Sequence, residues 1–184
     1  MPIDSNLDSQ QASVDLIFTL AGARIRKIFS WELFEQGGAK RLMLSTGRFE
    51  LRKFALLPVS PKPDLIAMAQ PIPAKERHCC VLFEAGEAQV IWVRKERLGT
   101  MTEIEFLARW LRENPEIETV TIVSSGYHLR RVRLCCLFLL PAMVQVKYVG
   151  VPNEKIGFVN PVLDWGKLGL YAAVLGWRRM FGKL

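Results

Sequence analysis

Hydroxyl, imidazole and guanidinium side chains gather in one short stretch of this 184-residue chain. The β-branched run 119–123 has the character of a strand, and the polar stretch after it holds Ser124, Ser125, His128, Arg130 and Arg131. A helix beginning there presents unpaired backbone N–H groups and the positive end of its dipole beyond the strand's end. Phosphate and carboxylate groups suit such a place. The pattern therefore predicts an anion-binding site, with His128 as the candidate general acid or base.

A plainer interpretation of the same stretch stays open. The arginines can be solvated helix surface, and His128 can be a capping or packing residue. For Arg133 the plainer interpretation is preferred.

Small residues and cations also follow two earlier predicted strands. The apolar run 15–20 leads to Gly22, Arg24 and Arg26, and the run 41–44 leads to Ser45, Gly47 and Arg48. Ligands of open α/β sheets bind beyond the carboxyl ends of the strands, so we expect these residues to surround one cleft with the later polar stretch. Thr102 and Glu103 are further candidates, although a capping box formed by Thr100 and Glu103 would explain Glu103 without a ligand.

The order of predicted elements favours a three-layer, Rossmann-like α/β domain. Helices are expected over 24–36, 49–57, 65–69 and 127–140 and from Thr100 to Asn114, and strands alternate with them. We expect a mostly parallel sheet of about five strands, a β-hairpin insertion over 79–94 and a C-terminal helix. The hairpin can extend the sheet or lie outside it. Residues 14–184 form the single domain, after a flexible N-terminus at residues 1–13.

Several of these motifs resemble a bacterial family of unknown biochemical function that includes YdcF, SanA and ElyC. The stretch Val-Ser-Ser-Gly-Tyr-His-Leu-Arg-Arg at 123–131 resembles the family's late Val-Thr-Ser-x-x-His-x-x-Arg-Ala motif. The strand at 15–22, Leu-Ser-Thr-Gly at 44–47 and Thr-Met-Thr-Glu at 100–103 follow in the family's order, so the resemblance spans roughly residues 14–152. Two departures are Thr-Met-Thr-Glu-Ile at 100–104, where the family usually has Thr-x-Glu-Asn, and Arg131, where it has Ala. The resemblance implies an α/β fold and a link to cell-envelope biogenesis, and it implies no particular reaction.

Composition narrows the class of partner. The formal charge of +7 and the pI near 9.5 favour a small anionic ligand, nucleic acid or an acidic membrane surface. Nucleic acid is the weakest of the three, because RNA-binding motifs, zinc-finger spacing and basic tracts are missing from the sequence. The four cysteines form two adjacent pairs inside apolar runs, which predicts reduced, buried thiols in a cytoplasmic protein and no metal site. No cofactor is identified, because the dinucleotide and P-loop fingerprints are both missing.

The tail from Trp165 to Leu184 combines apolar residues with Lys167, Arg178, Arg179 and Lys183. It can be a basic amphipathic helix in peripheral contact with an anionic membrane, at its cytoplasmic face. It can also be a terminal helix that covers one face of the sheet, which we expect for 168–175. No secretory signal is recognisable, and no apolar stretch reaches the roughly 20 residues of a membrane span.

The sequence therefore supports two functions. The first is an enzyme of the YdcF-like kind, a hydrolase or transferase acting on a small phosphorylated, nucleotide-like or otherwise anionic substrate. The alternative is a non-catalytic ligand-binding or membrane-surface regulatory protein.

Overall fold

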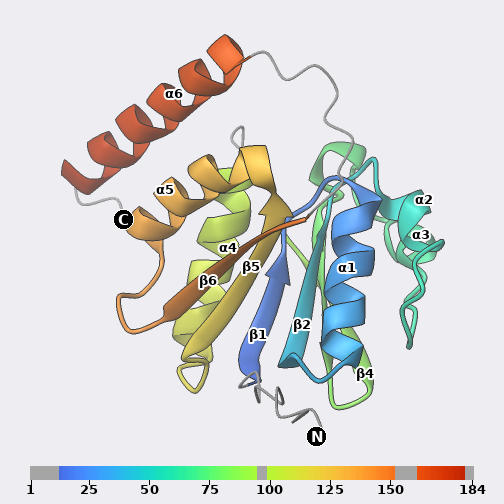
Figure 1. The fold of residues 1–184 in the computed structure, drawn as a ribbon. Helices are drawn as coiled ribbons and strands as arrows, with labels where there is room; N and C mark the ends of the chain where they lie inside the picture. The colour runs from blue at the N-terminus through green and yellow to red at the C-terminus, as the bar shows by residue number, and fades with distance from the viewer. Residues whose placement is uncertain (1–12, 95–98, 152–160, 181–184) are drawn as a thin grey trace, which may run out of the picture.

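The computed structural model describes residues 13–94, 99–151 and 161–180 (Figure 1), so the predicted flexible segment 1–13 lies outside the described residues apart from Ser13. The elements, in chain order, are β1 (Val14–Thr19), α1 (Arg24–Glu35), β2 (Ala39–Thr46), α2 (Leu51–Phe54), α3 (Leu65–Met68), η1 (Ala74–Glu76), β3 (Cys79–Glu84), β4 (Glu87–Trp92), α4 (Gly99–Glu113), β5 (Thr119–Ser125), η2 (Gly126–His128), α5 (Leu129–Leu139), β6 (Gln145–Val151) and α6 (Pro161–Met180).

One six-stranded sheet of order β4-β3-β2-β1-β5-β6 forms the middle layer. Strands β2, β1, β5 and β6 are parallel, so their carboxyl ends lie together, at what we call the carboxyl end of the sheet. The hairpin β3–β4 continues the sheet beside β2 in antiparallel orientation, which settles its position. The sequence predicted about five strands plus a hairpin, and within the described residues four parallel strands and the hairpin form the sheet.

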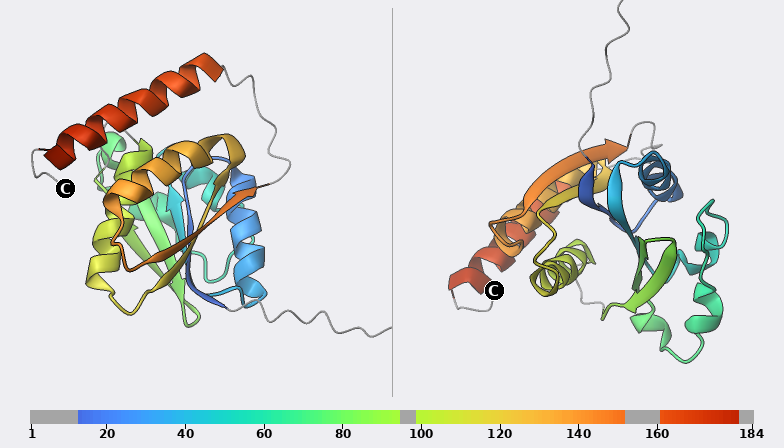
Figure 2. Two further views of the ribbon diagram at one scale, coloured as in Figure 1. Left: turned by 60° about the vertical axis from the view of Figure 1, so that its left-hand side comes forward. Right: turned by 90° about the horizontal axis from the view of Figure 1, so that it is seen from below.

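Helices cover both faces of the sheet and build two hydrophobic cores, which confirms the predicted three-layer α/β architecture (Figure 2). Ile17, Leu42 and Val81 pack toward α1, α2 and α3. Their strand neighbours face the other way, where Phe18 and Met43 belong to one hydrophobic core with residues of α4, α5 and α6. Because side chains alternate along each strand, the position of a residue at the carboxyl end determines on which face of the sheet its side chain lies.

Two predicted helices are shorter than expected. Helix α2 occupies only Leu51–Phe54 of the predicted range 49–57, because the chain then closes with turns in which the N–H groups of Leu56 and Leu57 bond three residues back. The predicted helix 127–140 is split into the 3₁₀ turn η2 and α5.

Helix α6 packs on the outside of α5 and α4, as the views in Figures 1 and 2 agree. Tyr171 and Leu175 are buried against that layer, so part of the tail covers the domain as expected. Among the described residues no helix is long and apolar enough to cross a membrane.

All four cysteines are free and buried, as predicted. Burial raises the pKa of Cys79, Cys135 and Cys136 to about 12, so these thiols stay protonated at neutral pH.

Candidate functional site at the carboxyl end of the sheet

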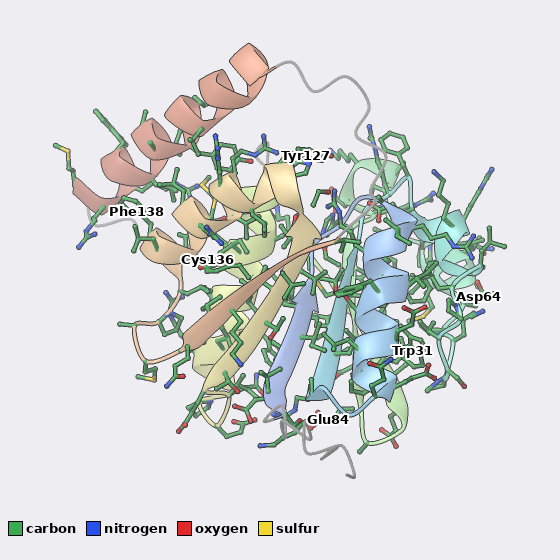
Figure 3. The ribbon with its side chains drawn as sticks, in the orientation of Figure 1. Trp31, Asp64, Glu84, Tyr127, Cys136 and Phe138 are labelled. Carbon is green, nitrogen blue, oxygen red and sulfur yellow. The ribbon has the colours of Figure 1, made fainter. Side chains whose placement is uncertain are left out.

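Three neighbouring strands bring most of the predicted site residues to one place. Thr19 of β1 is paired with Leu44 on one side and with Val123 on the other. The next residues of β2 and β5, Ser45 and Ser124, therefore lie just beyond the end of β1, one residue before their own strands end. Figure 3 shows Tyr127 at this end of the sheet and Glu84, in the β3–β4 hairpin, at the opposite end.

Arg26 joins the ends of β1 and β5 on the α1 face. The residue is 3% exposed, and its guanidinium donates to the Ala21 carbonyl at 2.9 Å through Nη1 and to the Ser125 hydroxyl through Nη2. Gly22 adopts φ +134°, and a Cβ at this position would lie 2.7 Å from Arg26 Nη1. Glycine is required here both by its backbone conformation and by the close approach of the guanidinium.

A small pocket opens beside this turn. It is lined by Gly22, Arg24, Lys27, Glu50, Lys53, Phe54 and Leu57 and encloses about 10 Å³, which is room for about one water molecule. Lys27 and Glu50 form an ion pair within it, and Arg24 donates to the Leu56 carbonyl at 2.7 Å. Three cations and one carboxylate line the pocket, so its charge favours an anion.

A buried polar cluster lies on the opposite face, under α4. The Glu103 carboxylate accepts from the Ala21 backbone N–H at 2.8 Å and from the Ser45 hydroxyl. His78 Nε2 lies 3.0 Å from Ser45 Oγ and 3.8 Å from Glu103 Oε1. Burial raises the pKa of Glu103 above its ordinary value, and the hydrogen bonds from Ser45 and Ala21 oppose that rise.

These contacts overturn the capping-box interpretation of Glu103. Helix α4 already includes Gly99 and Thr100, so Thr100 is an interior residue rather than an N-cap. The Glu103 side chain points toward the ends of β1 and β2, because its hydrogen-bond donors, Ala21 N–H and the Ser45 hydroxyl, lie there.

Two hydroxyls at the carboxyl end are fully buried and have no hydrogen-bond partner within the described residues. They belong to Thr46 of β2 and Ser124 of β5. Ser124 shares the face of Ile122, which packs with α4 and α5. Leaving such a group unsatisfied costs about 1 to 3 kcal/mol, so a bound water or ligand oxygen would stabilise either site.

His128 and Arg131 lie directly beyond Ser124 and Ser125. His128 is half-buried in η2, its Nδ1 contacts the Arg131 guanidinium, and its ring lies 4.3 Å from that of Tyr127. Arg131 is buried, whereas Arg130 is exposed on the next position of α5. The first turn of α5 therefore brings an imidazole and a guanidinium close to the end of β5.

Two predicted site residues lie away from this cluster. Arg48 is exposed and stacks over the Phe49 ring at 4.3 Å. Thr102 is buried against a separate pocket of about 270 Å³ that also includes Val93, Arg94, Glu105, Phe106 and Arg109. Neighbouring positions on α4 point in different directions, so Thr102 and Glu103 cannot face the same space.

Sequence reasoning missed three residues of the cluster: His78, Lys27 and Glu50. His78 directly precedes β3, and Thr46 of β2 is paired with Cys79, so the antiparallel strand brings its amino end to the carboxyl end of the sheet. The sequence prediction considered only residues that follow parallel strands, and His78 precedes an antiparallel one. The sequence feature that indicates His78 is its position immediately before a predicted hairpin.

The chain matches none of the family models, curated proteins or solved structures with which it was compared. Among the described residues no group of three or more His, Cys, Asp or Glu side chains is placed to hold a metal ion.

Proposed function

We propose that this chain is an enzyme that acts on a small phosphorylated or otherwise anionic substrate at the carboxyl end of the sheet. The observation that carries the proposal is the Ser124 hydroxyl, which is wholly buried and has no partner in the described part of the chain. It lies at the end of β5, just before η2 and α5. A substrate oxygen at this place would bond to the hydroxyl and meet the positive end of α5.

The charges around the cluster support an anion. Arg24, Lys27 and Lys53 outnumber Glu50 in the pocket on the α1 face. Beyond β5, His128 and Arg131 add an imidazole and a buried guanidinium. Guanidinium groups hold phosphate and carboxylate oxygens through paired hydrogen bonds.

The reaction class that fits is hydrolysis or transfer of a phosphoryl or related group. We assign His128 as a general acid or base and the buried arginines as groups that stabilise developing negative charge. The resemblance to the YdcF, SanA and ElyC family adds a setting to this proposal: cell-envelope biogenesis, on the cytoplasmic side and at the inner face of the membrane.

The test is calorimetric titration of the full chain with inorganic phosphate. His128→Ala and Arg24→Ala should each weaken phosphate binding about tenfold or more, because each removes a hydrogen-bond partner of a charged ligand. Arg133→Ala is the control, since Arg133 is exposed and stacks over Tyr148. Equal losses from all three would mean that only bulk charge attracts phosphate. Hydrolysis of p-nitrophenyl phosphate that His128→Ala abolishes would distinguish an enzyme from a binding protein.

A second candidate function is that of a membrane-surface regulatory protein, favoured by the outward face of α6. Leu170, Trp177 and Met180 are exposed there, and Arg179 lies at the same end of the helix. Exposed apolar side chains beside a cation are what an anionic lipid surface binds.

A further inference from the structure

We propose that the protein docks on the surface of an anionic membrane through one exposed patch, formed by residues 24–25 at the start of α1 and residues 48–56 around α2. This inference goes beyond the proposed function, because it assigns an interaction surface that stands whether or not the site turns over a substrate. The patch is also separate from the outward face of α6, which lies on the other side of the sheet (Figures 1 and 2).

Three large apolar side chains project from the patch. Ile25 is 42% exposed, Phe49 78% and Leu56 63%. Ile25 lies in the first turn of α1, Phe49 shortly before α2 and Leu56 shortly after it. Single exposed apolar residues are ordinary on a protein surface, but three gathered in one patch indicate that the patch binds a partner.

Cations alternate with these apolar side chains. Helix α2 buries Leu51 and Phe54 against the domain, so the two residues between them face outward. The exposed cations of the patch are Arg24, Arg48, Arg52 and Lys53. The patch therefore presents apolar and positively charged groups side by side.

Almost nothing in the patch offsets this positive charge. Glu50 is the only acidic residue between positions 47 and 63, and its carboxylate forms an ion pair with Lys27. No acidic residue lies between positions 22 and 31. The partner that complements the patch is therefore negatively charged.

Direct contacts join the two segments into one surface. Arg24 Nη2 donates to the Leu56 carbonyl at 2.7 Å, so the first turn of α1 lies against the turn that follows α2. The Arg48 guanidinium lies over the Phe49 ring at 4.3 Å from its centroid. Figure 1 shows α2 beside the amino end of α1.

An anionic membrane offers both kinds of group that the patch requires. Lipid phosphates accept hydrogen bonds from arginine and lysine, and the acyl region beneath them takes up exposed apolar side chains. Nucleic acid also offers phosphates, but its bases stack on aromatic rings and provide no apolar layer for the aliphatic Ile25 and Leu56. The formal charge of +7 adds attraction over a longer range.

The first measurement is sedimentation of the full chain with vesicles. One set is pure phosphatidylcholine, and in the other set part of the lipid is phosphatidylglycerol, which is anionic. We expect binding to the anionic vesicles alone. Added sodium chloride should weaken it, because exposed charges are screened over about 10 Å at 0.1 M salt.

Matched variants locate the surface that binds. Phe49→Ala should weaken binding to the anionic vesicles about tenfold or more, because its ring no longer enters the acyl region. The control is Leu137→Ala on α5, since Leu137 is also 78% exposed. Arg48→Glu should weaken binding by a similar factor, and its control is Arg133→Glu, which changes the net charge equally. Arg24 and Lys53 stay unchanged, because they also line the candidate pocket.

The second measurement uses the wild-type protein and needs no variant. Phosphatidylglycerol vesicles that contain a gadolinium-chelating lipid broaden the amide signals of residues close to the membrane. The signals of Ile25, Phe49 and Leu56 should broaden, while that of Leu137 should not.

The outcomes separate this inference from the alternatives. Absence of sedimentation with anionic vesicles, which is expected if an acidic protein or a nucleic acid binds the patch, would overturn it. Equal losses in Arg48→Glu and Arg133→Glu would overturn it as well, because bulk charge alone would then attract the protein. A loss confined to Trp177→Ala would overturn it and assign the docking to α6.

Failure of the proposed function has a different result. A protein that binds phosphate but no vesicles would overturn the inference and leave the proposed function standing. A protein that docks through the patch but binds no phosphate would overturn the proposed function and leave the inference standing.

Discussion

At the scale of single residues, the close approach of Arg26 to Gly22 links the backbone of the β1–α1 turn to the candidate site. Arg26 Nη1 lies 2.7 Å from the place where a Cβ of residue 22 would be, and the hydrogen bonds of the guanidinium to Ala21 and Ser125 link the end of β1 to the end of β5. Gly22 and Arg26 could be predicted as site residues, because a strand end followed by glycine and arginine favours an anion. Their mutual contact could not, since it depends on the positive φ of Gly22.

Gly22→Ala should therefore disturb both stability and binding. We expect a loss of about 1 to 3 kcal/mol in the free energy of unfolding, from backbone strain and from displacement of Arg26. Phosphate binding should weaken as well. Gly37→Ala is the control, because Gly37 also has a positive φ but a Cβ there would meet nothing within 4 Å. Chemical denaturation and calorimetry compare the two variants. Equal phosphate affinities of Gly22→Ala and Gly37→Ala would show that the position of Arg26 beside Gly22 does not matter for phosphate binding.

At the scale of elements, Asp15 links β1 to β2 and β5 at the end of the sheet opposite the candidate site. One carboxylate oxygen accepts from Thr119 N–H at 3.0 Å and from the Thr119 hydroxyl at 2.8 Å, and the other accepts from Lys40 Nζ at 2.7 Å. Burial alone would raise the pKa of Asp15, but the hydrogen bonds from Lys40, Thr119 and Glu118 outweigh it and lower the pKa to about 2.

Asp15→Asn should lower the free energy of unfolding by about 1 to 2 kcal/mol at pH 7. The folded-state pKa lies below the unfolded value, so this stabilisation is present above pH 4 and is lost as the pH falls toward 2. Urea unfolding of wild type and variant should therefore converge in acid. Asp64→Asn, which keeps a good N-cap for α3, should change stability little at either pH. A difference between wild type and Asp15→Asn that persists at pH 2 would exclude the ionic contribution.

The elements also show what the sequence could and could not predict. Hydrophobic runs and their breaks predicted the parallel strands and most helices, because a buried strand has a clear local pattern. The position of the β3–β4 hairpin depends on pairing between β2 and β3, which no local pattern specifies. His78 was missed for that reason. For Glu103 the sequence left a site role and a helix cap both open, because a carboxylate three residues after a threonine has the same spacing whether it caps the helix or crosses to the sheet.

At the scale of the whole molecule, α6 has two faces with different surroundings. Leu175 is fully buried against the layer of α5, whereas Trp177 is 62% exposed. The ion pair between Arg178 and Glu105 joins α6 to α4. The buried face contributes to the fold, and the outward face is exposed.

Two substitutions separate these contributions. Leu175→Ala should lower the free energy of unfolding by about 2 to 4 kcal/mol, whereas Trp177→Ala should change it by less than about 1 kcal/mol. If α6 binds lipid, Trp177→Ala should weaken sedimentation with vesicles rich in anionic lipid, and added salt should weaken it further. Unchanged stability in Leu175→Ala would contradict the packing of α6, and equal vesicle binding by wild type and Trp177→Ala would remove the membrane-surface candidate.

Backbone chemical-shift mapping with inorganic phosphate tests whether the carboxyl end of the sheet is a binding site. We predict that the amide signals of Gly22, Ser125 and Gly126 shift together and saturate with one dissociation constant, while those of Ala85 and Gly86 in the hairpin turn at the opposite end stay unchanged. Shifts confined to that opposite end, or spread evenly over exposed cations without saturation, would contradict an anion site at the carboxyl end.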